Sequence, residues 1–463
     1  MDSRLRGNDG WDGSSVNFDR GNRGRRVVAP RGHRARAIDG LLNPFAALFH
    51  AFLDRMDGAI VDGGIEASLP DGTTRLLGGR RPGPHPVVHL HRWRALISLA
   101  AGGSAGWYEA WARGDWSSPD PVPLFEIFTL NRTTLALLGR ASPATRVFRR
   151  IAHRLRRNDK AGSRRNIAYH YDLGNDFYRE WLDPTLTYSS ALFGSSRAQA
   201  EPVEAGWQTT PFDGLRVSAE GCPSAGDLEA AQQAKLDAIL ARTATEPGDT
   251  ILEIGCGWGS FAERAARGGR QVHALTLAAE QKRHVEARMA AAGLSGVAVE
   301  LTDYRDVVGS YDAVASIEMV EAVGQEYWPA YLRTIARVLK PGGRAAIQYI
   351  AIDDSIFEHY AANVDFIQTY VFPGGLLISE SRFRRIAEGC GLEWTDPHHF
   401  GADYAETLRL WRETFDAADL EGRIPVAFDN AFRELWRYYL MYCEGGFRGG
   451  AIDVAQVTLV KKG

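Results

Sequence analysis

The chain has 463 residues, 45% hydrophobic and 24% charged, which favours more than one globular unit around a large core. A formal net charge of −3 gives no global reason to expect nucleic-acid binding. The four cysteines lie far apart without a C-x-x-C pair, so no metal site or disulfide framework is predicted and a reducing cytoplasm fits. No apolar run approaches the roughly 20 residues of a membrane helix, and the Arg- and Gly-rich beginning lacks the apolar stretch of a secretory signal.

The first third of the chain divides by composition. Residues 1–37 are rich in Gly, Arg and Asp and are predicted to be a disordered tail, because they contain too few apolar side chains to form a core. Residues 38–145 are predicted to form a small α+β domain. Its expected elements are a helix over residues 41–56, a hairpin over 60–77 turning at Pro70–Gly72, a strand at 86–90 and a helix over 123–137.

Two further features precede the second half of the chain. Trp107, Trp111 and Trp116 are close in sequence and fit either half-buried core or a docking surface for a membrane or for the second domain. Residues 146–165 are dense in arginine. They fit an amphipathic helix lying on anionic lipid headgroups, or a solvated linker helix.

The most informative local motif is Thr-Ile-Leu-Glu-Ile-Gly-Cys-Gly-Trp-Gly over residues 250–259. An apolar strand runs into a glycine turn, and a helical pattern follows over residues 261–266. This order is the βα unit that opens a nucleotide-binding sheet. Glycine lets a ligand approach the backbone, and the start of the helix presents N–H groups. The spacing is tighter than in a dinucleotide fingerprint and resembles the first motif of class I S-adenosylmethionine (SAM) methyltransferases.

Strands and helices alternate after this motif, which favours an α/β fold with a parallel, doubly wound sheet. A helix over residues 228–241 precedes it, and residues 194–226, rich in Gly, Pro, Ser and Ala, are predicted to be an exposed insertion. The later predicted strands are 271–275, 297–301, 312–317, 344–350 and 453–460, and the later predicted helices are 279–292, 327–339 and one around 383–387.

Several motifs then occur in the order found in one enzyme family. They are His-Tyr-Asp-Leu-Gly-Asn at 170–175, Tyr-Ser-Ser-Ala-Leu-Phe at 188–193, Thr-Leu-Ala-Ala-Glu-Gln at 276–281, Ser-Ile-Glu-Met-Val-Glu at 316–321, Phe-Pro-Gly-Gly at 372–375, Tyr-Ala-Glu-Thr-Leu at 404–408 and Tyr-Cys-Glu-Gly-Gly-Phe-Arg at 442–448. The chain therefore resembles the cyclopropane fatty acid synthase and mycolic acid cyclopropane synthase family over residues 166–463. Its N-terminal part resembles that of the longer, phospholipid-acting bacterial members. The resemblance implies a Rossmann-like SAM methyltransferase sheet with a helical lid, preceded by the small α+β domain.

The resemblance also implies which residues bind the cofactor, SAM. Thr276 stands where most dinucleotide sites offer a carboxylate to the ribose, which argues against NAD. For Tyr188, the residues alone leave a packed core tyrosine equally open. The implied cofactor-binding residues are Tyr188, Ser189, Glu253, Gly255, Gly257, Gly259, Thr276, Gln281, Tyr304 and Arg305.

The implied reaction is attack of a cis alkene in an acyl chain on the SAM methyl group, followed by proton loss and ring closure. In the family a bound bicarbonate accepts the proton. Its expected holders here are Glu321, Tyr404 and Cys443. Ser190 stands in place of a family cysteine and Gln348 in place of a family histidine, and the histidine after the catalytic Glu is Ala322. The five candidate catalytic residues are therefore Glu321, Tyr404, Cys443, Ser190 and Gln348, and bicarbonate is the second expected ligand besides SAM.

A cation formed next to an acyl chain favours aromatic surroundings. The candidates to line an acyl tunnel, each of which also fits plain core packing, are Tyr360, Phe366, Tyr370, Phe372, Trp411, Phe432, Trp436, Tyr438 and Tyr439.

The sequence thus predicts a SAM-dependent methyltransferase that cyclopropanates unsaturated phospholipid acyl chains. It is expected in the cytoplasm, associated peripherally with the inner face of the cell membrane. No nucleic-acid partner is expected, and both a monomer and a homodimer remain open. Because Ser190, Ala322 and Gln348 differ from the residues of the family pattern, two alternatives to this function remain. One is a methyltransferase that makes methyl-branched lipids or acts on another small molecule; the other is a SAM- or lipid-binding protein with impaired catalysis.

Overall fold

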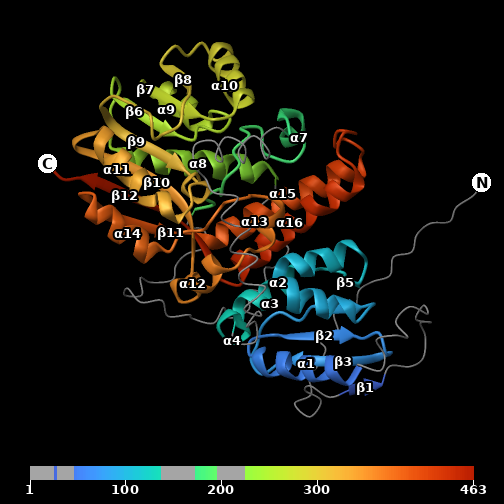
Figure 1. Cartoon of the computed structure of the whole chain (residues 1–463). Coiled ribbons are helices and arrows are strands. Elements are labelled where there is room, and N and C mark those ends of the chain that lie inside the picture. Colours follow the sequence, from blue (N-terminus) through green and yellow to red (C-terminus); the bar gives the residue numbers. More distant parts are fainter. Residues whose placement is uncertain (1–25, 29–45, 137–172, 195–224) are drawn as a thin grey trace, which may run out of the picture.

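The computed structural model describes residues 26–28, 46–136, 173–194 and 225–463. These residues form a small N-terminal α+β domain and a larger α/β domain (Figure 1). The predicted basic helix over 146–165, most of the predicted insertion over 194–226 and most of the predicted tail over 1–37 lie outside the described residues.

The N-terminal domain contains a five-stranded sheet in the order β1-β3-β2-β4-β5. The predicted hairpin is confirmed, since β2 pairs antiparallel with β3 around the turn at Pro70–Gly72. Within the predicted tail, one short stretch, Arg26–Val28, forms a strand that pairs antiparallel with β3. The strands are β1 (Arg26–Val28), β2 (Gly64–Ser68), β3 (Thr73–Gly78), β4 (Val87–Leu90) and β5 (Trp116–Ser117).

The helices that the structure describes in this domain are α1 (Ala46–Ala59), α2 (Arg94–Ala112), α3 (Val122–Leu130) and α4 (Arg132–Ala136). The helix predicted over 123–137 is divided at Asn131, whose side chain accepts hydrogen bonds from the backbone N–H groups of Val61 and Asp62 at 2.7 and 2.9 Å. Trp107 and Trp116 are buried and stacked, with ring centroids 4.4 Å apart. These two tryptophans are therefore core, while Trp111 is partly buried against Tyr438 of the larger domain.

The larger domain is built on a seven-stranded sheet in the order β11-β12-β10-β9-β6-β7-β8. The five strands from β10 to β8 run parallel, as predicted. The last strand departs from that pattern, because β12 is inserted antiparallel between β10 and β11. The strands are β6 (Thr250–Ile254), β7 (Gln271–Thr276), β8 (Val297–Leu301), β9 (Tyr311–Ile317), β10 (Leu339–Ile352), β11 (Leu392–His399) and β12 (Ile452–Lys461). Of these, β11 was missed by the sequence prediction.

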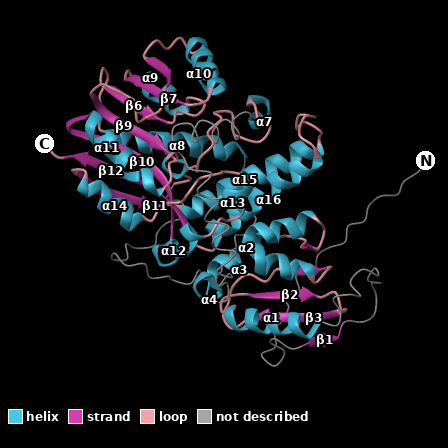
Figure 2. Cartoon of the chain, in the orientation of Figure 1, coloured by secondary structure: helices cyan, strands magenta, loops and turns pink. Residues whose placement is uncertain are grey.

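The two faces of this sheet are covered by α8 (Ala225–Thr243), α9 (Ser260–Arg267), α10 (Ala279–Ala291), α11 (Trp328–Val338) and α14 (Glu380–Gly389). A second set of helices lies between the sheet and the N-terminal domain, so that helices separate the two groups of strands (Figure 2). This set consists of α12 (Asp354–Ala362), α13 (Phe366–Tyr370), α15 (Gly401–Leu420) and α16 (Asn430–Arg448), with the short α7 (Asn175–Arg179) nearby. It corresponds to the expected helical lid. Within the described ranges, no helix combines the length and apolarity needed to cross a bilayer.

Helix α16 joins the two domains by close backbone packing against α3. A Cβ atom on Gly445 would lie 2.5 Å from the Cβ of Phe125, and one on Gly449 would overlap the Thr129 hydroxyl. The Thr129 hydroxyl also lies 3.2 Å from the Gly445 carbonyl oxygen. Only glycine permits helices to approach this closely, so the position of α16 depends on the N-terminal domain.

Candidate active site

The glycine turn after β6 has the backbone that the motif predicts. Gly255, Gly257 and Gly259 have φ values of +87°, +51° and +86°, which side-chain-bearing residues adopt at a cost. Gly259 permits helix packing, because a Cβ there would lie 2.8 Å from a methyl carbon of Val285 on α10. A Cβ on Gly257 would meet nothing within 4 Å.

Two N–H groups of this turn are already used within the protein. The backbone N–H groups of Gly255 and Cys256 both donate to the Leu275 carbonyl at the end of β7, at 3.1 and 2.9 Å. They fix the turn to the neighbouring strand and are not free to bind a ligand. What the first glycine contributes is therefore space and backbone shape.

A cavity, called the small cavity here, opens over the carboxyl ends of β6 and β7. It brings together eight predicted cofactor residues, namely Tyr188, Ser189, Glu253, Gly255, Gly257, Thr276, Gln281 and Tyr304. Two other predicted residues do not line it. Gly259 lies behind the turn, and the Arg305 guanidinium forms an ion pair with Asp303 at 2.6 Å. Arg305 therefore shapes the loop that carries Tyr304.

Three buried polar atoms on residues lining the small cavity have no hydrogen-bond partner: Glu253 Oε2, Gln281 Nε2 and the Tyr304 hydroxyl. The Thr276 hydroxyl donates to Gln281 Oε1 at 2.7 Å, which leaves the Gln281 amide N–H groups as the unused part of that side chain. Burial raises the pKa of Glu253 well above its ordinary value, so a positively charged ligand beside it would be favourable. Because buried polar groups rarely stay unpaired, these groups fit a cationic ligand that carries hydroxyl and amino groups.

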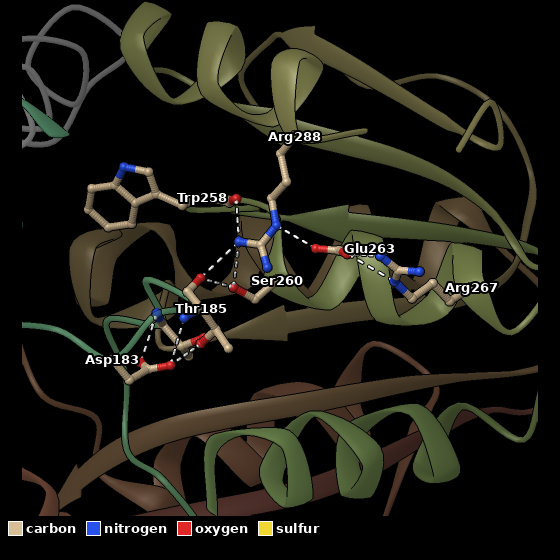
Figure 3. A network of polar contacts seen from close by, with 8 residues as sticks. Asp183, Thr185, Trp258, Ser260, Glu263, Arg267 and Arg288 are labelled. Carbon is tan, nitrogen blue, oxygen red and sulfur yellow. Dashed lines mark hydrogen bonds and ion pairs between the residues drawn. The ribbon is translucent and has the colours of Figure 1, made fainter. Parts of the chain in front are cut away.

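The segment that carries Tyr188 and Ser189 is fastened to the glycine turn by a polar network (Figure 3). The Arg288 guanidinium of α10 donates to the Thr185 carbonyl at 2.8 Å and pairs with Glu263 at 2.5 Å. The Ser260 hydroxyl donates to the same Thr185 carbonyl at 2.7 Å. The Asp183 carboxylate accepts the Thr185 backbone N–H at 2.9 Å. The network therefore holds this segment over the start of α9.

A second, mostly apolar cavity of about 770 Å³, called the large cavity here, lies between the two domains. Helices α1, α2 and α3 of the N-terminal domain form one wall, with Met56, Leu99 and Phe125 among the lining side chains. Of the aromatic residues predicted to line a tunnel, Tyr360, Phe372, Tyr438 and Tyr439 do so. The others, Phe366, Tyr370, Trp411, Phe432 and Trp436, are not among the lining residues and pack in the surrounding core.

The two cavities meet at three residues that line both: Tyr188, Glu318 and Ala322. The Tyr188 hydroxyl is 2.7 Å from the Tyr439 hydroxyl of α16. A group held in the small cavity and a chain held in the large cavity would therefore face each other at this junction.

Glu318 is the central side chain of the junction, and the sequence analysis gave it no role. It follows directly on β9 and has a φ of +47°, a strained conformation for a residue with a side chain. Its Oε1 accepts hydrogen bonds from the Ser190 backbone N–H at 2.9 Å and from Gln348 Nε2 at 2.8 Å. Its Oε2 accepts the Tyr404 hydroxyl at 2.7 Å. An acidic residue at the carboxyl end of a central strand was a usable signal, since ligands bind at that edge.

The five candidate catalytic residues are thus divided. Ser190, Gln348 and Tyr404 converge on Glu318, and of these only Tyr404 lines a cavity. Glu321 and Cys443 line the large cavity. The Ser190 side chain itself turns away, with its hydroxyl donating to the Ala191 carbonyl at 3.0 Å.

Glu321 and Cys443 are both neutral groups near pH 7. Burial and the nearby Glu318 carboxylate raise the pKa of Glu321 to about 8. Its Oε1 accepts the Ile350 backbone N–H at 2.5 Å, while its Oε2 is buried without a partner. Burial also raises the pKa of the Cys443 thiol, which removes it from consideration as a thiolate nucleophile.

The comparisons with known proteins identify the family. The model of the family described as mycolic acid cyclopropane synthetase matches residues 158–457. The chain belongs to this family. It is 37% identical to the tuberculostearic acid methyltransferase UfaA1 of Mycobacterium tuberculosis, over 82% of this chain and 84% of that protein. It is 35% identical to the cyclopropane-fatty-acyl-phospholipid synthase of Escherichia coli K12, over 62% of this chain and 66% of that protein.

A solved structure of mycolic acid cyclopropane synthase CmaA1, complexed with SAH and CTAB, is 30% identical to this family member, with a TM-score of 0.55. The match covers 64% of this chain and 98% of the CmaA1 chain. The protein is therefore a SAM-dependent methyltransferase with the Rossmann-like fold, and the unpaired groups of the small cavity fit SAM.

Proposed function

We propose that this enzyme transfers the methyl group of SAM to the cis double bond of an unsaturated phospholipid acyl chain and forms a cyclopropane fatty acid. The observation that carries the proposal is the meeting of the small and large cavities at Tyr188, Glu318 and Ala322. When bound, SAM supplies an electrophilic methyl group on a sulfonium. The 35% identity to a cyclopropane-fatty-acyl-phospholipid synthase supports the choice of substrate.

The residues of this chain would act by placement and by exclusion of water. Glu253, Gln281 and Tyr304 supply the polar partners of the cofactor. The apolar walls of the large cavity hold the acyl chain away from water, which matters because an alkene is a weak nucleophile and must be aligned with the methyl group. Aromatic faces such as those of Tyr439 and Phe372 can stabilise a cation that forms there.

The proposal places the enzyme in the cytoplasm, at the inner face of the membrane that contains the phospholipid. The N-terminal wall of the large cavity and the arginine-rich residues 146–165 support this location. Residues 146–165 lie outside the described part of the chain, so their contribution rests on sequence alone. Binding to anionic vesicles at low salt is the expected outcome, since attraction of basic segments to anionic lipid is electrostatic.

A second candidate is a methyl-branched lipid product. Two observations favour it. The match to the tuberculostearic acid methyltransferase spans more of both chains than the match to the E. coli enzyme. Ala322 at the junction, and Ser190 and Gln348 hydrogen-bonded to Glu318 there, stand where the family resemblance implies other residues. Both candidates share the same first step and differ in how the cation is resolved.

The test is lipid analysis of cells that express the chain, together with the purified protein, SAM and vesicles of monounsaturated phospholipid. A product that has gained one CH2 and has lost its alkene without a methyl branch supports cyclopropanation. A methyl- or methylene-branched chain supports the second candidate. Bound SAM with no change in the lipid would contradict both.

A further inference from the structure

We propose that Glu318 is the proton acceptor of the reaction, and that its carboxylate occupies the place where the family resemblance implies bicarbonate. The inference rests on the proposed function, since it needs a transferred methyl group that loses a proton. Its basis is the set of hydrogen bonds at the junction of the two cavities.

The donors expected to hold an anion already hold a carboxylate of the chain itself. The Ser190 backbone N–H and the Gln348 amide converge on Oε1, and the Tyr404 hydroxyl donates to Oε2. These three positions belong to the predicted bicarbonate site. Gln348 is oriented in turn, because its Oε1 accepts the Gln456 side-chain amide at 3.1 Å.

A free anion therefore does not fit beside Glu318. Two negative groups in a buried site repel each other strongly, and the donors that could offset the repulsion are in use. The basic side chain that interacts with Glu318 is Lys235 of α8, which is fully buried and donates to the Ser189 hydroxyl at 2.5 Å. We therefore assign no step to bicarbonate in this chain.

Glu318 has one hydrogen-bond acceptor position left for a proton from the reacting groups. An ionised carboxylate offers about four lone-pair positions, and the three hydrogen bonds leave one unused on Oε2. Glu318 lines both cavities, so this position is beside the point where a methyl group would pass from one to the other. The strained φ of +47° aims the side chain there, and strain of this kind is concentrated at functional sites.

The proton step balances within the chain and its substrates. After the methyl carbon has bonded to one alkene carbon, the neighbouring carbon is a cation. One C–H bond of the methyl group breaks, its electron pair forms the ring bond to the cationic carbon, and the proton goes to Oε2 of Glu318. If a hydride shift moves the cation to the methyl-bearing carbon first, the same pair forms a C=CH2 bond instead, so one base serves both candidate products.

The charged and titratable neighbours suit this role. Burial raises the pKa of Glu318, while Lys235 and the three donors oppose the rise. Burial lowers the pKa of Lys235 to about 8, opposed by Glu318 and Asp183. Glu321, with a pKa of about 8, holds a proton at neutral pH and therefore adds no second negative charge beside Glu318.

The experiment compares wild type, Glu318→Gln and Glu318→Gly with purified enzyme, SAM and monounsaturated phospholipid vesicles, in CO2-free buffer and with added bicarbonate. Wild-type turnover should not depend on bicarbonate. Glu318→Gln should lose turnover by about 100-fold or more, the usual contribution of a general base, while it keeps SAM affinity measured by calorimetry. Glu318→Gly tolerates the left-handed backbone and opens a space, so added bicarbonate should restore part of its turnover.

The comparison variant is Glu321→Gln, which removes the other carboxyl of the pair. Any loss of turnover in it should not be restored by bicarbonate. A second readout uses isotope-labelled bicarbonate followed by NMR, where binding should be seen with Glu318→Gly and not with wild type. Bicarbonate binding or dependence in wild type, or full turnover of Glu318→Gln, would overturn the assignment. A wild-type enzyme that makes no lipid product would instead overturn the proposed function.

Discussion

The small and large cavities are built in different ways. Almost every residue that lines the small cavity comes from the segment around Tyr188 or from the ends of four neighbouring strands, β6, β7, β8 and β9, and the loops that follow them. The large cavity draws on both domains, from Phe52 to Ile452. A pocket at the carboxyl ends of adjacent strands follows from the fold, whereas a pocket between domains depends on how they pack. The two sites should therefore respond independently to substitution, except at the junction.

The largest expected effect on one cavity alone comes from Gly255→Ala. The alanine would have to adopt the φ of +87° that Gly255 has, and its Cβ would lie 2.8 Å from Cγ of Met319. The turn must therefore shift. SAM affinity should fall by about tenfold or more, equivalent to about 1.4 kcal/mol, measured by calorimetry. The control is Gly248→Ala, which has a φ of +97° and nothing within 4 Å of the new Cβ. Equal losses of SAM affinity in both variants would show that backbone strain, and not the cavity, is responsible.

A smaller effect, restricted to the other cavity, is expected from Leu99→Trp. Leu99 lines the large cavity from α2, and a larger side chain there shortens the space for an acyl chain. Turnover should fall several-fold with long acyl chains and less with short ones, with SAM affinity unchanged. The matched control is Ile97→Trp on the same helix, because Ile97 is 46% exposed and is not among the lining residues. A loss of SAM affinity in Leu99→Trp would break the distinction between the cavities.

The smallest effect is expected from Asp312→Asn, near the amino end of the central strand β9 and outside the lining of both cavities. Burial raises the pKa of Asp312, but Lys340 and the N–H and hydroxyl groups of Thr250 outweigh this and lower it to about 2. The stabilisation is therefore present above the ordinary pKa of 3.8 and is lost as the pH falls towards 2. At neutral pH the variant should lose about 1 kcal/mol of unfolding free energy, with turnover unchanged.

Denaturant unfolding at several pH values measures this effect. The difference between Asp312→Asn and wild type should narrow below about pH 4, since the Asp312 carboxyl begins to protonate in the unfolded chain there. A difference that stays constant down to pH 3 would contradict the assigned cause.

The parts of the molecule that sequence predicted well are those with local signals. The βα repeat from Thr250 onwards has a clear periodicity of apolar residues and glycines at its turns. Its strands and helices lie within a few residues of their expected positions. The antiparallel insertion of β12 could not be read from periodicity, because a buried strand has the same apolar pattern in either direction. The helix expected over 123–137 is interrupted because Asn131 bonds to a loop 69 and 70 residues away.

The candidate site shows the same limit. Eight of the ten predicted cofactor residues line the small cavity. Arg305 does not, because its guanidinium pairs with Asp303, and Gly259 does not, because it packs against Val285. Glu318 was visible in the sequence but had no assigned role, because its importance lies in donors that come from residues 190, 348 and 404. Contacts among segments so far apart depend on tertiary packing, which no local pattern specifies.

The glycines at 445 and 449 also carry an evolutionary implication. The CmaA1 chain is matched over nearly its whole length by only 64% of this chain, so a large share of this protein has no counterpart there. The close approach of α16 to α3 is possible only where both positions lack side chains. A sequence with side chains at both positions would therefore have to dock an N-terminal domain on α16 in a different way.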